Sequence, residues 1–499
     1  MSSERDSYKQ IFKTTSIFGG IQIFNILISI VKSKIIAVLL GPAGLGIISI
    51  FNSASTLIAS FTNLGINVSA VKSIATLSQI EEQGRQHIII AVVKKIIWYT
   101  GILGFLVTVI LSPLLSKMSF GNYSYTFSFA LLGLSLLGLQ VSNGQITILQ
   151  GLRKVKLIAI SSLIGAVFGL FFSVPLYYFF GAEGIAPALV ATSMAAVFTS
   201  WYFLKKAEIP FVKVNFTTIK KEGKAIVKLG FLISLTAIFP AVAAYVVRLF
   251  IANVGNIEDV GLFTAGFAIV GTYVGMVFSA MSTDYYPSLA EVANDNVKCT
   301  EKVNQQILVS ILILAPILTI LLVFVKLGIV ILYSSKFLGT VKMIQWAALG
   351  VFFQAFSWCI AFLFLAKGDS KIFFWNEFIP NLYTLLFNCI AFKIWGLEGL
   401  GISFFISYLL YFAQVYIITL KKYSFKLDIN IIKICLLQFL VISITFLVVT
   451  FFAEPISYVI GIILVLGSLY ISIHILEIKT NSISNTYNKI RERRKNIFK

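Results

Sequence analysis

Long apolar runs separated by short polar connections fill most of the chain. Most runs have about 20 residues or more, the length that an α-helix needs to cross the hydrocarbon core of a bilayer. The runs are continuous and do not alternate between apolar and polar positions, so they lack the pattern of transmembrane β-strands. The pattern therefore predicts an all-α polytopic membrane protein.

We predict about 14 transmembrane helices from these runs. The predicted spans are 11–40, 44–70, 88–116, 124–149, 157–180, 185–204, 226–252, 262–281, 306–332, 341–366, 372–394, 400–420, 431–452 and 456–477. The longest connections lie around 205–225 and 282–305. The chain has no room for an extramembrane catalytic domain, so we do not expect an enzyme.

Composition supports lipid as the solvent of this chain. Hydrophobic residues make up 58% of it and charged residues 12%, against roughly 25% charged residues in a soluble globular protein. The net charge of +20 comes from Lys and Arg in short loops, not on a folded soluble face. We therefore expect contact with anionic membrane lipids and no nucleic-acid partner.

Cysteine and histidine do not suggest a cofactor. The four cysteines occur singly, without a Cys-x-x-Cys pair, and neither histidine is near one of them in the sequence. This spacing argues against a disulfide framework and a metal site, and no cofactor is expected. The polar start and the long first apolar run also argue against a cleavable signal peptide.

The distribution of basic residues predicts the orientation of the chain. With 14 spans, both termini lie on the same side of the membrane. Of the 40 Lys and Arg residues, 32 fall in or beside the connections on that side, five fall on the other side, and three lie within spans. Positively charged loops face the cytoplasm. We therefore predict that both termini are cytoplasmic.

The first twelve spans contain an internal repeat with one fixed offset. The turn 181–185 (Gly-Ala-Glu-Gly-Ile) recurs at 396–400 as Gly-Leu-Glu-Gly-Leu. At the same offset, Gly46 corresponds to Gly261 and Lys156 corresponds to Lys371. Because each half has six spans, the repeats have parallel topology and are related by an axis along the membrane normal.

The repeat predicts the domain organisation. Two pseudo-symmetric six-helix bundles face a central cavity and two extra C-terminal helices lie at the periphery. The predicted parts are an N-terminal bundle at 1–205, a cytoplasmic linker at 206–225, a C-terminal bundle at 226–420, an additional helix pair at 431–477 and a basic cytoplasmic tail at 478–499.

Three basic residues fall inside predicted spans. Lys32 and Lys34 lie near the external end of the first span, and Arg248 lies near the external end of the seventh. The offset of the repeat aligns Arg248 with Ser33, so both halves carry cations at nearly the same height. Snorkelling to headgroups explains any one of them. The matched placement favours a shared cationic cavity that attracts anions, above all phosphate.

Polar residues in the spans allow two interpretations. Asn25 and Asn52 belong to a larger group of amides in spans one, two and four, which also contains Asn63, Asn67, Gln140, Asn143 and Gln145. Hydrogen bonds between helices explain any single one, whereas together they suit a hydrated lumen that contacts sugar hydroxyls. Asp284 is a candidate gate contact, although a helix end at Pro287 is the more ordinary explanation.

The chain resembles bacterial O-antigen and related lipid-linked oligosaccharide flippases. These form the polysaccharide-transporter branch of the multidrug/oligosaccharidyl-lipid/polysaccharide superfamily. The resemblance rests on residues 34–46 (Lys-Ile-Ile-Ala-Val-Leu-Leu-Gly-Pro-Ala-Gly-Leu-Gly), on 150–153 (Gln-Gly-Leu-Arg) and on the stretch from Tyr245 to Pro287. It covers about 1–420. The extra helix pair departs from the many members that stop at twelve spans.

The resemblance implies a MATE-like fold and a transport function. Such proteins move undecaprenyl-pyrophosphate-linked glycans from the inner to the outer leaflet of the bacterial cytoplasmic (inner) membrane by alternating access. It also implies that Lys34 and Arg248 attract pyrophosphate, whereas Lys32 is supported by position alone. Arg153, at the end of the second motif, is a further candidate lumen contact. The resemblance further implies a role in surface-glycan or lipopolysaccharide biosynthesis, with a glycan polymerase as a partner.

Two alternatives remain open. A multidrug or cation antiporter of the same superfamily would place a carboxylate well inside a span, and the sequence shows none near a midplane. Glu377, a turn and a half into the eleventh span, comes closest. A membrane polysaccharide polymerase or glycosyltransferase would need carboxylate or histidine chemistry and a large external loop, and the external loops here are short.

Overall fold

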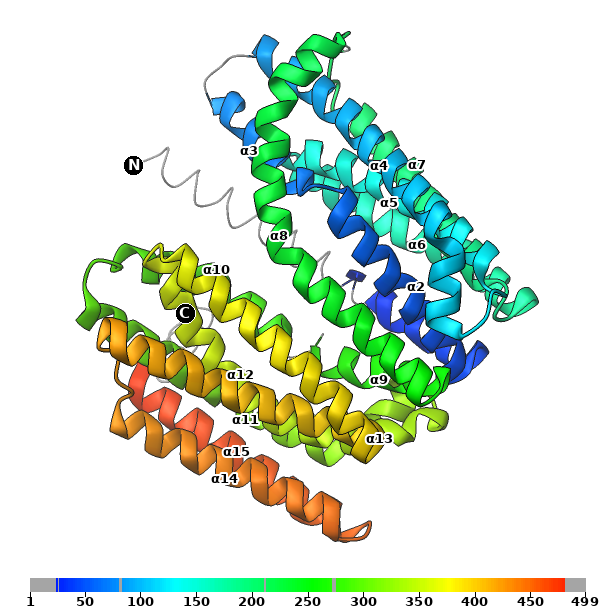
Figure 1. The fold of residues 1–499 in the computed structure, drawn as a ribbon. Coiled ribbons are helices and arrows are strands. Elements are labelled where there is room, and N and C mark those ends of the chain that lie inside the picture. Colours follow the sequence, from blue (N-terminus) through cyan, green and yellow to red (C-terminus); the bar gives the residue numbers. More distant parts are fainter. Residues whose placement is uncertain (1–23, 26, 80–82, 211, 272–274, 481–499) are drawn as a thin grey trace, which may run out of the picture. The chain divides into compact units, whose positions relative to one another are not determined.

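The computed structural model describes residues 24–480, apart from 26, 80–82, 211 and 272–274. Within these residues the chain forms helices joined by short connections and contains no β-strand (Figure 1). Eleven of the described helices are long and apolar enough to cross a membrane. The predicted all-α polytopic class is confirmed.

The helices match the predicted spans, with a few merged or divided. α13 (Ser370–Tyr423) has 54 residues and would be about 80 Å long if straight, far more than the roughly 30 Å of a bilayer core. It contains two predicted spans, because the backbone breaks at Gly396, with φ 58°. The other long helices are α4 (Gln83–Phe120), α5 (Thr126–Gly151), α6 (Val155–Phe180), α7 (Ile185–Lys205), α8 (Phe216–Val254), α11 (Asn296–Leu332), α12 (Val341–Ala366), α14 (Ile429–Phe451) and α15 (Ile456–Thr480).

Three predicted spans are not single helices among the described residues. The first is helical at 24–25 and over 27–39, and residues 11–23 and 26 lie outside the described residues. The second consists of α2 (Gly41–Thr62) and α3 (Ile66–Gln79), separated where Leu64 and Gly65 have positive φ. The eighth falls on α9 (Ile257–Ile269) and α10 (Gly275–Glu291). The short 3-10 helix η2 (Ser335–Thr340) precedes α12.

Contacts divide the chain into two compact units. The first extends to Leu262 and includes 332–336, and the second comprises 263–331 and 337–499. α8 belongs to the first unit because it packs against α2, α3 and α4. The predicted bundles at 1–205 and 226–420 stay a prediction.

Backbone geometry confirms the repeat at the turns. The equivalent glycines Gly181 and Gly396 have φ 55° and 58°. Arg153 and its equivalent Gly368 also share a positive φ, 56° and 72°. The helix bounds follow the same offset, since α5 at 126–151 corresponds to α12 at 341–366. The two halves therefore repeat at the level of backbone conformation.

The second glycine of each repeated turn makes the same close approach. A Cβ added to Gly184 would lie 2.2 Å from the carbonyl oxygen of Leu176, and one added to Gly399 would lie 2.1 Å from that of Ala391. Both carbonyls lie eight residues before their glycine. A larger residue would force the paired helices apart, so this turn specifically requires glycine.

The extra C-terminal pair packs on the second unit. The Phe439 ring of α14 lies 4.9 Å from the Phe352 ring of α12, measured between centroids. Gly461 of α15 approaches the side chain of Val323 in α11. The buried Gln438 side chain joins α14 to α15 by donating to the Ser472 hydroxyl over 3.0 Å and accepting from the Ser468 hydroxyl over 2.8 Å. Such buried polar contacts hold helices together in lipid.

The end of α10 differs from the prediction. α10 begins at Gly275 and continues through Pro287 to Glu291, so the expectation that Pro287 ends the helix is wrong. The helix extends for about one further turn beyond the proline.

All four cysteines are free. The basic tail lies outside the described residues beyond Thr480.

Candidate functional site

Arg248 is held at the contact between α8 and α2. Its Nε donates a hydrogen bond to the Ser49 hydroxyl oxygen over 2.7 Å, and one terminal nitrogen donates to the Ala244 carbonyl oxygen over 2.8 Å. The side chain is half-buried. A guanidinium presents its five N–H groups in a planar fork, so two fixed bonds set the direction of the whole group. The cation therefore has a defined position.

The C-terminal part of α8 is anchored on both sides of Arg248. Three residues before it, the Tyr245 hydroxyl lies 3.0 Å from the Ser119 hydroxyl, and both residues are buried. Five residues after it, the Asn253 amide donates to the Met118 carbonyl oxygen over 3.0 Å. Both contacts join α8 to the last turn of α4. They fix the height and rotation of the helix that carries Arg248.

Lys32 and Lys34 lie on the helix at 27–39, and both are half-buried. Successive residues of an α-helix are rotated by about 100°, so residues two apart point about 200° away from each other. A single face of this helix therefore cannot present both lysines. Asn25 lies seven residues, or about two turns, before Lys32 and shares its side of the helix.

The other predicted contacts are spread over the chain. Asn52 is exposed one turn after Ser49, so it lies on the side of α2 that receives Arg248. Arg153 is exposed in the left-handed turn between α5 and α6. Asp284 is exposed on α10, in the second unit. Among the predicted site residues, Arg248 is brought to α2 by its bond to Ser49. A pyrophosphate site formed by these residues stays a prediction.

Several span amides join helices to one another. The Gln140 amide donates to the Asn63 side-chain oxygen over 2.7 Å and to the Thr100 hydroxyl over 3.1 Å. Gln145 accepts a hydrogen bond from Ser200 of α7. The interhelical interpretation is therefore confirmed for these amides, which tie neighbouring helices of the first unit together.

A second polar cluster surrounds Glu377 in the second unit. Its carboxylate accepts a hydrogen bond from the Tyr411 hydroxyl over 2.9 Å, and that hydroxyl accepts one from Asn376 over 3.1 Å. Glu377 lines a cavity of about 220 Å³ together with Tyr408 and Ser407. The Ser407 hydroxyl is buried without a hydrogen-bond partner. Glu377 is therefore an acid within a predicted span whose surroundings are polar.

The sequence singled out Glu377 as an acid inside a predicted span, but it did not indicate which side chains surround it. Its partner Tyr411 lies 34 residues further on, in the second half of α13. The two halves fold back on each other at Gly396, whose backbone break is what brings these side chains together. The matched turn at 396–400 was the available signal. The described residues contain no group of three or more His, Cys, Asp or Glu able to hold a metal ion.

The sequence is similar to known proteins over most of its length. Residues 35–342 match the model of a family described as polysaccharide biosynthesis protein. A lipid III flippase of Escherichia coli (strain K12) is 22% identical over 386 residues, which cover 76% of this chain and 91% of that protein. A lipid III flippase of Shigella flexneri matches with the same identity and coverage.

Solved structures share the fold. The lipid II flippase MurJ in an inward closed conformation has a TM-score of 0.71 at 16% identity, with 93% of this chain and 99% of that chain covered. An inward-facing multidrug-resistance MATE transporter of the MOP superfamily has a TM-score of 0.63 at 16% identity, with 80% of this chain and 96% of that chain covered. The MATE-like architecture is thereby confirmed.

Proposed function

Because the chain belongs to the polysaccharide biosynthesis protein family, we propose that it is a flippase for lipid-linked precursors of polysaccharides. The matched region runs from the first external turn to the start of α12 and includes Arg248. The two flippases similar in sequence and the flippase similar in fold support this class of function. The task is transport, carried out by helices within the membrane.

The substrate in this proposal is an undecaprenyl-pyrophosphate-linked oligosaccharide, either an O-antigen unit or a similar surface glycan. It moves from the inner to the outer leaflet of the bacterial cytoplasmic membrane by alternating access. Both termini face the cytoplasm, and a glycan polymerase takes over the product outside. The membrane lipids are the other partners.

The observation that carries the proposal is the fixed position of Arg248 within a membrane helix. An ionisable residue in a span is costly and usually serves a pathway or a ligand. Its bonds to Ser49 and to the Ala244 carbonyl hold the guanidinium in one orientation. Guanidinium binds phosphate oxygens through parallel N–H bonds, which suits a pyrophosphate group. Lys34 supplies the second cation in the proposal.

A second candidate function is a cation or drug antiporter, and Glu377 is the observation that favours it. Its carboxylate lines a cavity together with hydroxyl groups, as a site for a cation would. The fold of the MATE transporter is compatible with it. A polymerase or glycosyltransferase is less favoured, because its chemistry needs an extramembrane domain and the connections between the described helices are short.

Deletion of the gene tests the function. We expect a lipid-linked oligosaccharide to accumulate in the inner leaflet and surface glycan to disappear. The wild-type gene should remove the accumulation and restore surface glycan, while an Arg248→Ala variant expressed at the same level should do neither. Efflux of cationic drugs from the same cells distinguishes the antiporter. Normal glycan with a loss of drug efflux would overturn the flippase proposal.

A further inference from the structure

A basic pocket in the first unit lies apart from Arg248. It has a volume of about 430 Å³ and lies between the first half of α4 and the linker that precedes α8. α4 contributes His87, Lys94, Lys95 and Trp98, and the linker contributes Lys213. Residues 87, 91, 94 and 98 are spaced three or four positions apart, and residue 95 follows 91 by four, so one side of α4 forms the wall.

The linker is packed firmly enough to form the other wall. Ile209 and Val214 pack against a buried cluster that includes Ile89 and Ile90 of α4. Further along, a Cβ on Gly223 of α8 would lie 2.9 Å from the Ile96 side chain, so the two helices approach closely. These contacts hold the pocket open between fixed elements of the same unit. It is a feature of the fold.

The charges of the pocket have one sign. The described residues that line it include no acid, and none of the ion pairs found among the described residues involves Lys94, Lys95 or Lys213. The nearby acid of α8, Glu222, pairs with Arg85 over 3.8 Å. Three ammonium groups gathered without a carboxylate repel one another. An anion placed among them would relieve that repulsion.

The beginning of α8 adds a second attraction for anions. Asn215 lines the pocket and stands at the N-cap of this 39-residue helix, but its side chain makes no capping hydrogen bond. The first amide groups of a helix point outward and carry the positive end of the helix dipole. Phosphate binds readily at such a position. The lysines and the helix start therefore favour the same ligand chemistry.

The remaining wall of the pocket is apolar. Trp98 is 50% exposed one turn beyond Lys94, and Ile90, Pro210 and Val212 also line the pocket. Tryptophan concentrates at the level of lipid headgroups, and lysine extends from there into water. A ligand with a charged end and an apolar chain fits both walls at once.

We propose that this pocket binds the phosphate group of a lipid from the leaflet predicted to be cytoplasmic. The lysines and the start of α8 bind the phosphate, and Trp98 lies beside the apolar chain. The same chemistry is offered by an anionic phospholipid and by the pyrophosphate of a polyprenyl-linked lipid. The proposal concerns binding alone, so it does not depend on the proposed transport.

The test compares lipid binding to the purified full chain by native mass spectrometry. The probes are phosphatidylglycerol, zwitterionic phosphatidylcholine, polyprenyl pyrophosphate and inorganic phosphate. The variant combines Lys94→Gln, Lys95→Gln and Lys213→Gln. The matched control combines Lys154→Gln, Lys156→Gln and Lys371→Gln, which removes three exposed lysines at or just before the starts of α6 and α13, on the same predicted side. Replacing the pocket lysines by arginine keeps the charge and reports on folding.

We expect the pocket variant to bind at least one anionic lipid roughly tenfold or more weakly, since each lysine near a charged lipid surface contributes about fivefold. The control and the arginine variant should bind like the wild type. A loss confined to phosphatidylglycerol identifies a phospholipid site, and a loss confined to polyprenyl pyrophosphate identifies the substrate lipid. Unchanged binding of both, an equal loss in the control, or equal affinity for inorganic phosphate would overturn the proposal.

Discussion

Gly46 and Gly261 each make room for the helix that carries the other. A Cβ on Gly46 would lie 2.1 Å from the carbonyl oxygen of Ile257, and one on Gly261 would lie 1.9 Å from that of Pro42. Ile257 is the equivalent of Pro42 in the repeat, as Gly261 is the equivalent of Gly46. The two contacts are therefore one contact repeated in both directions, which is how two equivalent surfaces meet across a two-fold axis.

Alanine at either glycine should separate α2 from the first turn of α9. The carbonyl oxygens belong to the backbone and cannot rotate away, so Gly46→Ala and Gly261→Ala should each cost about 1–3 kcal/mol of stability. Thermal unfolding in detergent measures the loss. Gly328→Ala is the control, because a Cβ there meets nothing within 4 Å. Equal unfolding temperatures for all three variants would contradict the close contact.

The sequence predicted the repeat because turns depend on local chemistry. A positive φ favours glycine, so Gly181 and Gly396 marked equivalent turns without knowledge of any distant contact. Apolar length likewise predicted the spans, since lipid imposes it directly. The division at Gly396 was predicted in this way, as the turn between two spans. The division at Leu64 was not, because it lies within an apolar run.

The candidate site was predicted only in part. The presence of Arg248 in a span was visible, because one charge in an apolar run stands out. Its bond to Ser49 was not, because the two residues are far apart in the sequence. The Glu377 cluster depends on residues from both halves of α13, and the basic pocket depends on a linker folded against α4. Contacts between distant segments leave no periodic signal in a sequence.

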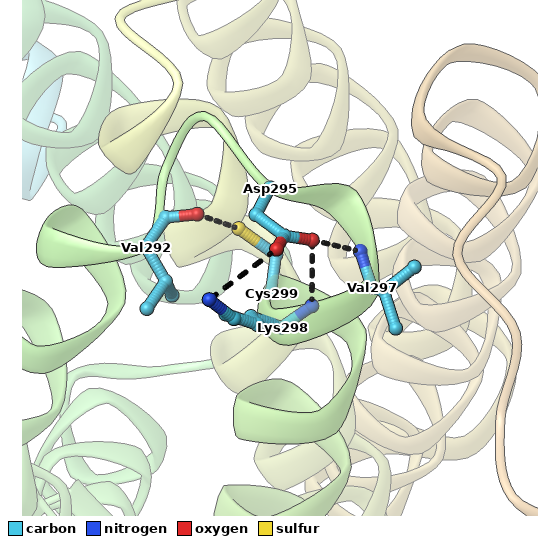
Figure 2. Close-up of polar contacts among 5 residues, drawn as sticks. All are labelled: Val292, Asp295, Val297, Lys298 and Cys299. Atoms are coloured by element: carbon cyan, nitrogen blue, oxygen red, sulfur yellow. Dashed lines mark hydrogen bonds and ion pairs between the residues drawn. The ribbon is translucent and has the colours of Figure 1, made fainter.

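Asp295 should give the start of α11 a stability that depends on pH. Its carboxylate accepts hydrogen bonds from the backbone amides of Lys298 and Val297, at 3.1 and 3.0 Å (Figure 2). The Lys298 amide foremost, and then the Val297 amide and the Lys298 ammonium, hold the pKa of this carboxyl below its usual range. A lowered pKa stabilises the fold above the unfolded pKa of about 3.9.

This stabilisation should disappear as the pH falls below about 4 and through the lower folded pKa. We expect Asp295→Ala to unfold at a lower temperature than the wild type at pH 7, with the difference shrinking in acid. Asp295→Asn keeps an acceptor for the amides but does not titrate, so its difference from Asp295→Ala should persist. Unfolding temperatures in detergent from pH 7 to pH 3 test this. A constant gap between wild type and Asp295→Ala would refute the capping role.

Reporter fusions test the predicted orientation. A reporter joined after residue 256, between α8 and α9, should be external, and one joined after residue 215 should be cytoplasmic. The reason is the concentration of Lys and Arg on one side of the spans. A phosphatase that is active only outside and a fluorescent protein that folds only inside give opposite signals. Reversed signals at either position would break the predicted topology.

Lys32 and Lys34 should respond differently to substitution. Because residues two apart on a helix point about 200° from each other, one face of helix 27–39 can supply only one of them to a ligand. We expect Lys34→Ala to remove surface glycan and Lys32→Ala to leave most of it, at equal expression. The double variant should resemble Lys34→Ala. Full display by both single variants would remove this helix from the proposed site.

The bond between Arg248 and Ser49 should be measurable as an energetic coupling. Arg248→Ala should abolish glycan display, because it removes the charge. Arg248→Lys keeps the charge but has no Nε–H group for the Ser49 hydroxyl, so its transport should be slower by about tenfold or more. Ser49→Ala should cause a similar slowing, since a hydrogen bond to a charged group contributes about 1.5–3 kcal/mol.

The double variant Arg248→Lys with Ser49→Ala distinguishes orientation from charge. If Ser49 acts by orienting the guanidinium, Ser49→Ala should have little further effect once Arg248 is lysine. Initial rates of glycan appearance, normalised to the amount of protein in the membrane, supply the four corners of the cycle. Ser55→Ala, on the same helix but about 120° around its axis from Ser49, is the control. Independent, multiplicative effects of the two substitutions would show that Ser49 does not position Arg248, although Arg248 itself would still be required.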